Sequence, residues 1–310
     1  MNSDLMIETK GLTKSFGKLV AVNGLNLNVR RGNIHGFVGP NGAGKTTTMK
    51  MLIGAIRSTG GEGYINGHPV GSLEARKSLG FSPERPSFYV DMTTWDYLVY
   101  MGRLAGMKTD AAQKRARELI DWLELTKFRD SKVGGFSAGM KQRLSLAQAM
   151  THQPQLLILD EPTANLDPDG RMSLTEKLRQ LCQEQRITIF VSSHQLLELE
   201  QLVDAVTLIE KGRTVAEDSV RDLKQELTLN RYVLKVSKRE VVVKALQGQT
   251  CVQDMTVDAD GAIHLISSDF AALQSKVIEA VTRAGAEMEY FGKEQANLQD
   301  VYRQTMGRDQ

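Results

Sequence analysis

A glycine-rich segment over residues 39–47 constrains this chain more than any other stretch, because it matches the pattern G-x-x-x-x-G-K-[ST] in full. Main-chain N–H groups can surround a polyanion only where no Cβ blocks their approach, so glycines here favour phosphate binding. A short apolar run, Ile34–Val38, precedes the segment, and apolar residues follow it at helical spacing over residues 46–56. A strand leading in and a helix leading out are the context that a phosphate-binding loop requires. The segment therefore predicts a nucleoside triphosphate site, against the alternative of a glycine-rich turn that binds nothing.

The side chains of this segment predict separate roles. Lys45 can reach the β and γ phosphate oxygens, and the hydroxyl of Thr46 can be a ligand of Mg²⁺. The helix that begins near Lys45 directs its free N–H groups at the same phosphates. The predicted phosphate-binding residues are Gly39, Pro40, Asn41, Gly42, Ala43, Gly44, Lys45, Thr46 and Thr47.

The composition sets the class of protein. A chain of 310 residues predicts one large domain and a smaller one, and a net charge of +2 with both signs interspersed predicts no nucleic-acid surface. Cys182 and Cys251 lack the spacing of a metal site, so we expect buried structural thiols in a reducing cytosol. No signal peptide and no run of ~18 apolar residues is evident, so any membrane role is expected from outside the bilayer.

Periodicity places the other elements. Strands are predicted over residues 6–11, 25–30, 34–38, 79–82, 156–159 and 187–191. Residues 13–17 are expected to form a turn that presents Phe16, and residues 60–71 a hairpin or loop. Residues 85–153 are expected to be a mainly helical insertion, with Thr94 capping one helix and a second helix over residues 112–125.

Two strand ends carry candidate chemistry. The apolar strand 156–159 ends in Asp160 and Glu161, and a carboxylate at this edge beside a phosphate loop can hold Mg²⁺. A structural acid pair is the alternative. The strand 187–191 is followed by His194, a candidate for contact with the γ-phosphate, although a lone histidine is usually structural. Ser137 opens a helix that continues to Met150, and the segment is either a second phosphate contact or a plain helix cap.

The order of these motifs resembles the ATP-binding subunit of an ABC transporter, over about residues 5–225. The resemblance implies an α/β fold, a P-loop NTPase core of ABC type with a β-subdomain and the helical insertion, in a domain of residues 1–228. It implies that Glu161 and His194 are catalytic and that Thr46, Glu84 and Asp160 bind Mg²⁺. The further residues that it implies for ATP binding are Phe16 against the adenine, Ser137, Ala138 and Gly139 in the signature, and Asp167 in the D-loop.

Two positions depart from the commonest family pattern. The signature is usually Leu-Ser-Gly-Gly-Gln, whereas this chain has Phe-Ser-Ala-Gly-Met at residues 136–140. Glu84 stands where the Q-loop of the family has glutamine. Both departures resemble the subgroup of exporter ATPases that pair with separate membrane subunits.

The last part of the chain, residues 229–310, predicts a small α+β domain. Its pattern is β-α-β-β-α-β followed by a helix, which suggests a ferredoxin-like sandwich. The predicted segments are strands 231–237, 252–257, 263–267 and 287–291, helices 241–246 and 270–284, and a last helix that contains residues 298–306. We expect this accessory domain to stabilise a dimer.

The resemblance also implies partners. Each chain has one phosphate loop and one signature, so two copies would sandwich two ATP molecules and drive a separate transmembrane permease from the cytoplasmic face of the membrane. Phe88 and Tyr89 either contact that permease or fold back into the helical insertion. The rival class is a non-transport ABC ATPase that acts on ribosomes or chromosomes. A third class, a regulator without turnover, would be expected to lack Glu161 or His194.

Overall fold

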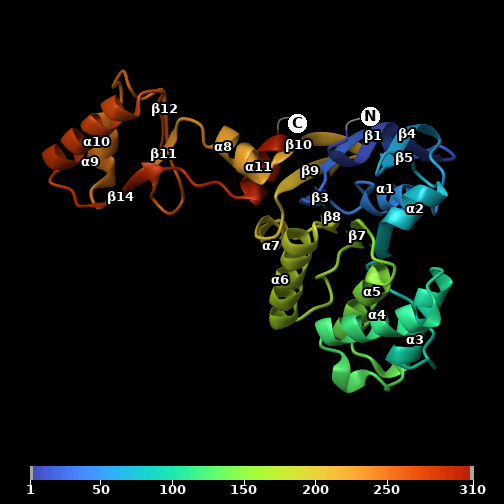
Figure 1. Ribbon diagram of the computed structural model, residues 1–310. Helices are drawn as coiled ribbons and strands as arrows, with labels where there is room; N and C mark the ends of the chain where they lie inside the picture. The colour runs from blue at the N-terminus through green and yellow to red at the C-terminus, as the bar shows by residue number, and fades with distance from the viewer. Residues whose placement is uncertain (1–2, 308–310) are drawn as a thin grey trace. The chain divides into compact units, whose positions relative to one another are not determined.

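The protein divides into two compact units, Met1–Val220 and Arg221–Gln310, and the computed structural model describes residues 3–307. The first unit contains two sheets and most of the helices (Figure 1). Helix α8 (Val220–Leu227) contains the point of division. Cys182 and Cys251 are both free thiols, and the expected burial holds for Cys182 but is wrong for Cys251, which is half-buried.

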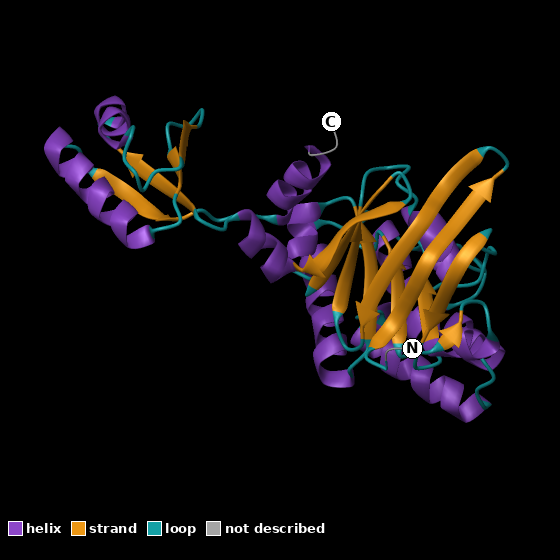
Figure 2. Ribbon diagram, turned by 90° about the horizontal axis from the view of Figure 1, so that it is seen from above, coloured by secondary structure: helices purple, strands orange, loops and turns teal. Residues whose placement is uncertain are grey.

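The first sheet of this unit is antiparallel, with strand order β2-β1-β4-β5, and Figure 2 draws the strands of the protein in orange. Its strands are β1 (Leu5–Phe16), β2 (Leu19–Arg30), β4 (Gly60–Ile65) and β5 (His68–Pro69). The expected turn over residues 13–17 is wrong, because β1 continues through Phe16 and only Gly17 and Lys18 connect it to β2. Gly11, at a φ of 60°, lies where the register shifts between Thr9 and Leu12, so the glycine marks a bulge inside the strand and not its end. The hairpin expected over residues 60–71 is confirmed by β4 and β5.

The second sheet has six strands in the order β10-β9-β3-β8-β7-β6, parallel except for the β9–β10 pair. Its strands are β3 (Ile34–Val38), β6 (Leu79–Ser82), β7 (Leu156–Asp160), β8 (Thr188–Ser193), β9 (Ala205–Glu210) and β10 (Arg213–Ser219). Every residue of β3, β7 and β8 is buried, as mostly apolar strands inside a parallel sheet predict. Parallel strands end at one edge, so the ends of β3, β7 and β8 are brought together.

Helices complete the unit. Those around the sheets are α1 (Lys45–Leu52), α2 (Leu73–Ser78), α6 (Pro168–Gln185) and α7 (Leu196–Glu200). The insertion between β6 and β7 contains α3 (Thr94–Leu104), α4 (Thr109–Trp122), η1 (Thr126–Phe128), η2 (Val133–Gly135) and α5 (Ala138–Met150). Thr94 is not the cap of α3: Thr93 accepts the hydrogen bond from the Asp96 amide, and the Thr94 hydroxyl donates to the Phe128 carbonyl. The predicted cap is wrong by one residue because Thr93 and Thr94 are adjacent threonines.

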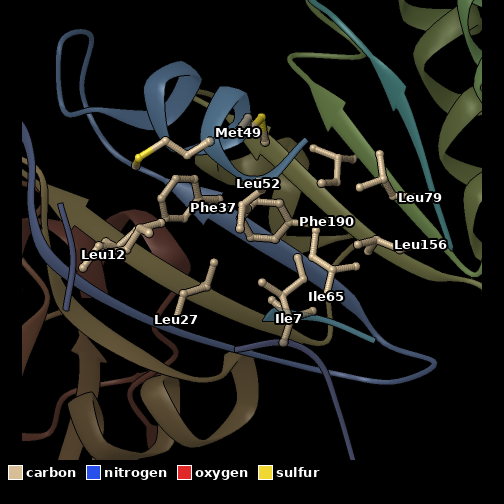
Figure 3. Packing of buried hydrophobic residues seen from close by; sticks show 14 of the residues in the cluster. Ile7, Leu12, Leu27, Phe37, Met49, Leu52, Ile65, Leu79, Leu156 and Phe190 are labelled. Atoms are coloured by element: carbon tan, nitrogen blue, oxygen red, sulfur yellow. The ribbon is translucent and has the colours of Figure 1, made fainter. Parts of the chain in front are cut away.

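Helix α1 is held in the main core of this unit. Met49 and Leu52 are fully buried beside Phe37 of β3 and Phe190 of β8, whose ring centroids are 5.1 Å apart (Figure 3). Residues of the antiparallel sheet, including Ile7, belong to the same cluster. Each such side chain contributes about 1.5–3 kcal/mol of burial free energy. The core therefore fixes the start of α1 relative to the end of β3.

The second unit has a four-stranded antiparallel sheet in the order β12-β13-β11-β14. Its elements are β11 (Arg231–Val236), α9 (Arg239–Leu246), β12 (Asp254–Val257), β13 (Ile263–Ile266), α10 (Phe270–Ala284), β14 (Met288–Lys293) and α11 (Leu298–Gly307). Its core joins helices α9 and α10 to the sheet, with Val242 of α9, Val277 of α10 and Leu265 of β13 fully buried. The predicted β-α-β-β-α-β order is confirmed.

Candidate active site

The phosphate-binding loop joins β3 to α1 and requires its glycines. Gly42 and Gly44 have φ angles of 82° and 104°, which side-chain-bearing residues rarely adopt. A Cβ on Gly39 would lie 2.2 Å from the carbonyl oxygen of Ile209, so the loop packs directly on β9. Only glycine can occupy these positions without strain or clash, and the main chain is left able to approach a ligand.

Lys45 folds over this loop. Its Nζ donates hydrogen bonds to the carbonyls of Gly39, at 2.7 Å, and Pro40, at 3.3 Å. Burial lowers the pKa of Lys45, while the charges of Glu161, Asp160 and Glu84 act in the opposite direction. A partly desolvated ammonium group gains when it pairs with an anion. The position thus suits a contact with phosphate oxygens.

Asp160 is held by hydroxyl groups from two neighbouring elements. The Thr46 hydroxyl donates to Oδ2 at 3.2 Å, and the Ser192 hydroxyl donates to Oδ1 at 2.6 Å. Ser192 also accepts the Glu161 amide hydrogen at 3.0 Å, so one serine fixes both acids. Sequence reasoning missed this role of Ser192. Parallel pairing of β7 with β8 places it opposite Asp160, and the available signal was its place near the end of a strand, two residues before His194.

Glu161 and His194 form the second pair of the site. His194 Nδ1 lies 2.9 Å from Glu161 Oε2, and the Glu161 residue is 9% exposed. Glu161 has a φ of 48°, a left-handed conformation that is unfavourable for a glutamate. The structure therefore brings together Lys45, Thr46, Asp160, Glu161 and His194, all predicted from the sequence.

Phe16 is not part of the hydrogen-bonded set that Thr46, Asp160 and Glu161 belong to. The residue is 50% exposed at the end of β1, with Lys14 Nζ 4.9 Å from the centroid of its ring. An exposed ring is available for stacking on a base. Its adenine contact stays a prediction.

The signature and the D-loop aspartate occupy two helix starts. Ser137 caps α5 by accepting from the Met140 amide at 3.3 Å, and Asp167 caps α6 by accepting from the Gly170 amide at 2.9 Å. Ser137 and Ala138 are exposed, and a Cβ on Gly139 would lie 3.3 Å from Leu166. Their predicted contacts with ATP stay predictions.

The predicted magnesium ligands are oxygen donors of the kind that Mg²⁺ prefers. Thr46 and Asp160 are already adjacent, and the cation would add charge to a buried carboxylate whose direct partners are hydroxyls. Glu84 follows β6 with its side chain 45% exposed and 3.6 Å from Arg85 Nε. Among residues 3–307, no three His, Cys, Asp or Glu side chains form a metal cluster. Mg²⁺ commonly takes only one or two carboxylates and completes its shell with phosphates and water, so the residues fit.

A glycine-rich loop after β3, a lysine over it and a buried acid pair at the end of β7 define a P-loop nucleoside triphosphatase. The family model described as ABC transporter matches residues 22–164. The bacitracin transport ATP-binding protein BcrA of Bacillus licheniformis is 36% identical to the chain over 97% of both proteins. The daunorubicin/doxorubicin resistance ATP-binding protein DrrA of Streptomyces peucetius is 33% identical, over 96% of this chain and 91% of its own.

Solved structures agree with the sequence relatives. The dimeric structure of a bacterial ABC transporter cassette superposes with a TM-score of 0.64 at 25% identity, over 69% of this chain and 98% of its own. The chain belongs to the family of ABC transporter ATP-binding proteins. It is an ATP-hydrolysing transporter subunit, and the alternative of a non-transport ATPase finds no support in these relatives.

Proposed function

We propose that this chain drives export of a small molecule through a separate transmembrane permease by binding and hydrolysing ATP as a dimer. The observation that carries the proposal is the continuous set of hydrogen bonds from Thr46 through Asp160 and Ser192 to Glu161 and His194. Thr46 and Asp160, which we propose as metal ligands, lie with an acid and a histidine at one edge of the sheet. Phosphoryl transfer needs mainly positioned groups and neutralised charge, and this set supplies both.

Each residue of the set has a proposed role. The loop of residues 39–47 and Lys45 hold the phosphates, while Thr46 and Asp160, with Glu84 nearby, would hold Mg²⁺. When bound, Mg²⁺ neutralises charge on the phosphate oxygens. Glu161 orients the attacking water and accepts its proton, and His194 steadies the γ-phosphate.

A second copy of the chain would complete the site. Ser137, Ala138 and Gly139 lie at the start of α5, exposed or half-buried, where a helix N-terminus attracts anions. The solved cassette relative is a dimer. We propose that these residues and Asp167 act on the ATP held by the partner copy, and that Phe16 stacks on the adenine.

The proposed permease contact is an exposed apolar patch. Among residues 3–307, none of the helices has the length and apolar character to cross a bilayer. Tyr89, Val90 and Tyr100 are 56%, 55% and 38% exposed, and Tyr89 and Tyr100 lie edge to face at 5.7 Å. Exposed apolar clusters of this kind mark interaction sites. Peripheral attachment at the cytoplasmic face of the membrane follows from such a contact.

The proposed direction of transport is export, and it rests on the names of relatives. One relative is named for bacitracin transport, another for daunorubicin and doxorubicin resistance, and a third for Nod factor export.

We also propose a division of the chain into two domains. Residues 1–228 form the ATP-binding domain, and residues 229–310 form an accessory domain that stabilises the dimer.

Co-purification tests the proposal. The tagged full chain, recovered from native membranes in mild detergent, is expected to bring a membrane-spanning protein in stoichiometric amount, and the complex should hydrolyse ATP. Recovery of the chain from the soluble fraction alone, or on ribosomes, would contradict it.

A further inference from the structure

Arg171, on the first turn of α6, joins two parts of the site that the sequence presents separately. Its Nε donates to the Leu166 carbonyl at 3.0 Å, and Leu166 directly precedes Asp167. Its Nη1 forms an ion pair with Glu198, on helix α7, which begins two residues after His194. One guanidinium group therefore connects the D-loop to the helix that follows His194.

A cavity of about 670 Å³ lies between α6 and α7 and is lined by residues of both helices, including Met172 and Thr175 of α6 and Leu197 of α7. Helix α7 is five residues long, and of these only Leu199 is buried, where its side chain lies against Gly36 of β3. Apolar packing thus connects α7 to β3, and the polar contacts of Arg171 connect α7 to the D-loop.

The chemistry of arginine suits this connection. A guanidinium group is planar and has donors at fixed angles, so it can hold a carbonyl and a carboxylate at once. A lysine ammonium at the same position is a point charge on a flexible stem. The Arg171 and Glu198 side chains are 31% and 40% exposed, and an ion pair this exposed adds little to the free energy of unfolding. We therefore expect the ion pair between Arg171 and Glu198 to affect the position of α7 more than the stability of the fold.

We propose that Arg171 is a positioning residue that fixes His194 relative to the D-loop. It acts through Glu198 and the Leu166 carbonyl and touches neither ATP nor metal. When the loop of residues 164–167 moves, Arg171 moves α7 with it, and the His194 imidazole changes its position at Glu161. The inference rests on the proposed role of His194.

The first test compares variants of two arginines on α6. Arg171→Ala is expected to lower the maximal ATPase rate about tenfold, with half-saturating ATP changed less than about twofold. Arg171→Lys should recover only part of the rate. The matched control is Arg179→Ala, an exposed arginine farther along the same helix, which should keep the wild-type rate. Thermal midpoints of all variants are expected within about 3 °C of wild type. Equal rates for Arg171→Ala and Arg179→Ala would overturn the proposal.

The second test has a readout that a stabilising role alone would not change. The chain has five histidines, so ring-labelled protein gives a small set of imidazole NMR signals that single variants can assign. Arg171→Ala and Glu198→Gln should both shift the His194 signal and leave that of His264 in place. The double variant should be no slower than Arg171→Ala, since both changes break one connection. An unmoved His194 signal, or additive rate losses, would overturn the inference.

The proposed role of His194 and the proposed role of Arg171 can be contradicted separately. If His194→Ala hydrolyses ATP like wild type, the proposed role of His194 is wrong. If His194→Ala is inactive but Arg171→Ala matches wild type, that role stands and the assignment of Arg171 is wrong.

Discussion

His194 Nδ1 lies 2.9 Å from Glu161 Oε2, and Glu161 holds this position with a backbone φ of 48°. A left-handed glutamate costs about 1–3 kcal/mol unless its surroundings fix it. Here the Ser192 hydroxyl accepts the Glu161 amide hydrogen, so the strain is offset by a bond from the neighbouring strand. The Glu161 carboxylate lies against His194 in this conformation.

Ser192 should therefore control the rate without controlling ATP affinity. Ser192→Ala removes the donor to Asp160 and the acceptor for the Glu161 amide, and is expected to lower the maximal rate about 10- to 100-fold. Half-saturating ATP should change little, because the phosphate loop is intact. The matched control is Ser267→Ala, a fully buried serine that follows β13 in the second unit. A wild-type rate for Ser192→Ala would show that the bridge has no role in hydrolysis.

Glu84 is expected to tune the metal requirement and to have no role as the base. Its charge acts on Lys45, but its side chain is 45% exposed. At ~4 Å from a metal, a unit charge contributes on the order of 4 kcal/mol at an effective dielectric near 20, and repulsion from the γ-phosphate offsets most of that. Glu84→Gln should keep hydrolysis within about tenfold and shift the Mg²⁺ concentration for half-maximal activity. Complete loss of activity at saturating Mg²⁺ would make Glu84 part of the catalytic set.

The two neighbouring aromatics of the insertion should behave differently. Phe88 is half-buried and packs edge to face on the buried Tyr97 at 5.3 Å, whereas Tyr89 is 56% exposed. Phe88→Ser is expected to destabilise the chain by about 2 kcal/mol. Tyr89→Ser should leave soluble ATPase activity within about twofold and abolish stimulation by the permease. Normal coupling in Tyr89→Ser would place the permease contact elsewhere.

His35 gives the first unit a predictable acid sensitivity. It is buried in β3, its Nε2 lies 2.7 Å from the Thr207 hydroxyl, and that hydroxyl donates to Glu217. Burial lowers the pKa of His35 from 6.5 to about 3. Below pH 6.5 the imidazole of the unfolded chain takes up a proton that the imidazole of the folded chain does not. The free energy of unfolding therefore decreases as the pH decreases. By pH 4 the loss is about 3 kcal/mol.

Denaturant unfolding between pH 4 and 7.5 measures this loss. His35→Gln retains a donor for Thr207 and cannot ionise, so its stability should vary less with pH than that of wild type. The same slope in both proteins would assign the acid sensitivity to other groups.

The parts of the fold that depend on local sequence could be predicted. The strands β3, β7 and β8 are short, mostly apolar segments, and the phosphate loop has a fixed spacing. The extent of β1 could not be predicted, because Gly11 at the bulge looks like the end of a strand in the sequence. The bond of Arg171 to Leu166 and its ion pair with Glu198 depend on where α7 packs, and no local pattern encodes that.

We propose that Glu161 accepts the proton of the attacking water in an ATP-bound dimer. Steady-state phosphate release by Glu161→Gln, measured beside size-exclusion chromatography with Mg–ATP, tests this role. We expect a rate ~10²–10⁴ lower than wild type, with ATP binding retained and a shift of the variant to the dimer when ATP is present. Phosphate release within a few-fold of wild type, with no ATP-dependent dimer, would contradict this role of Glu161.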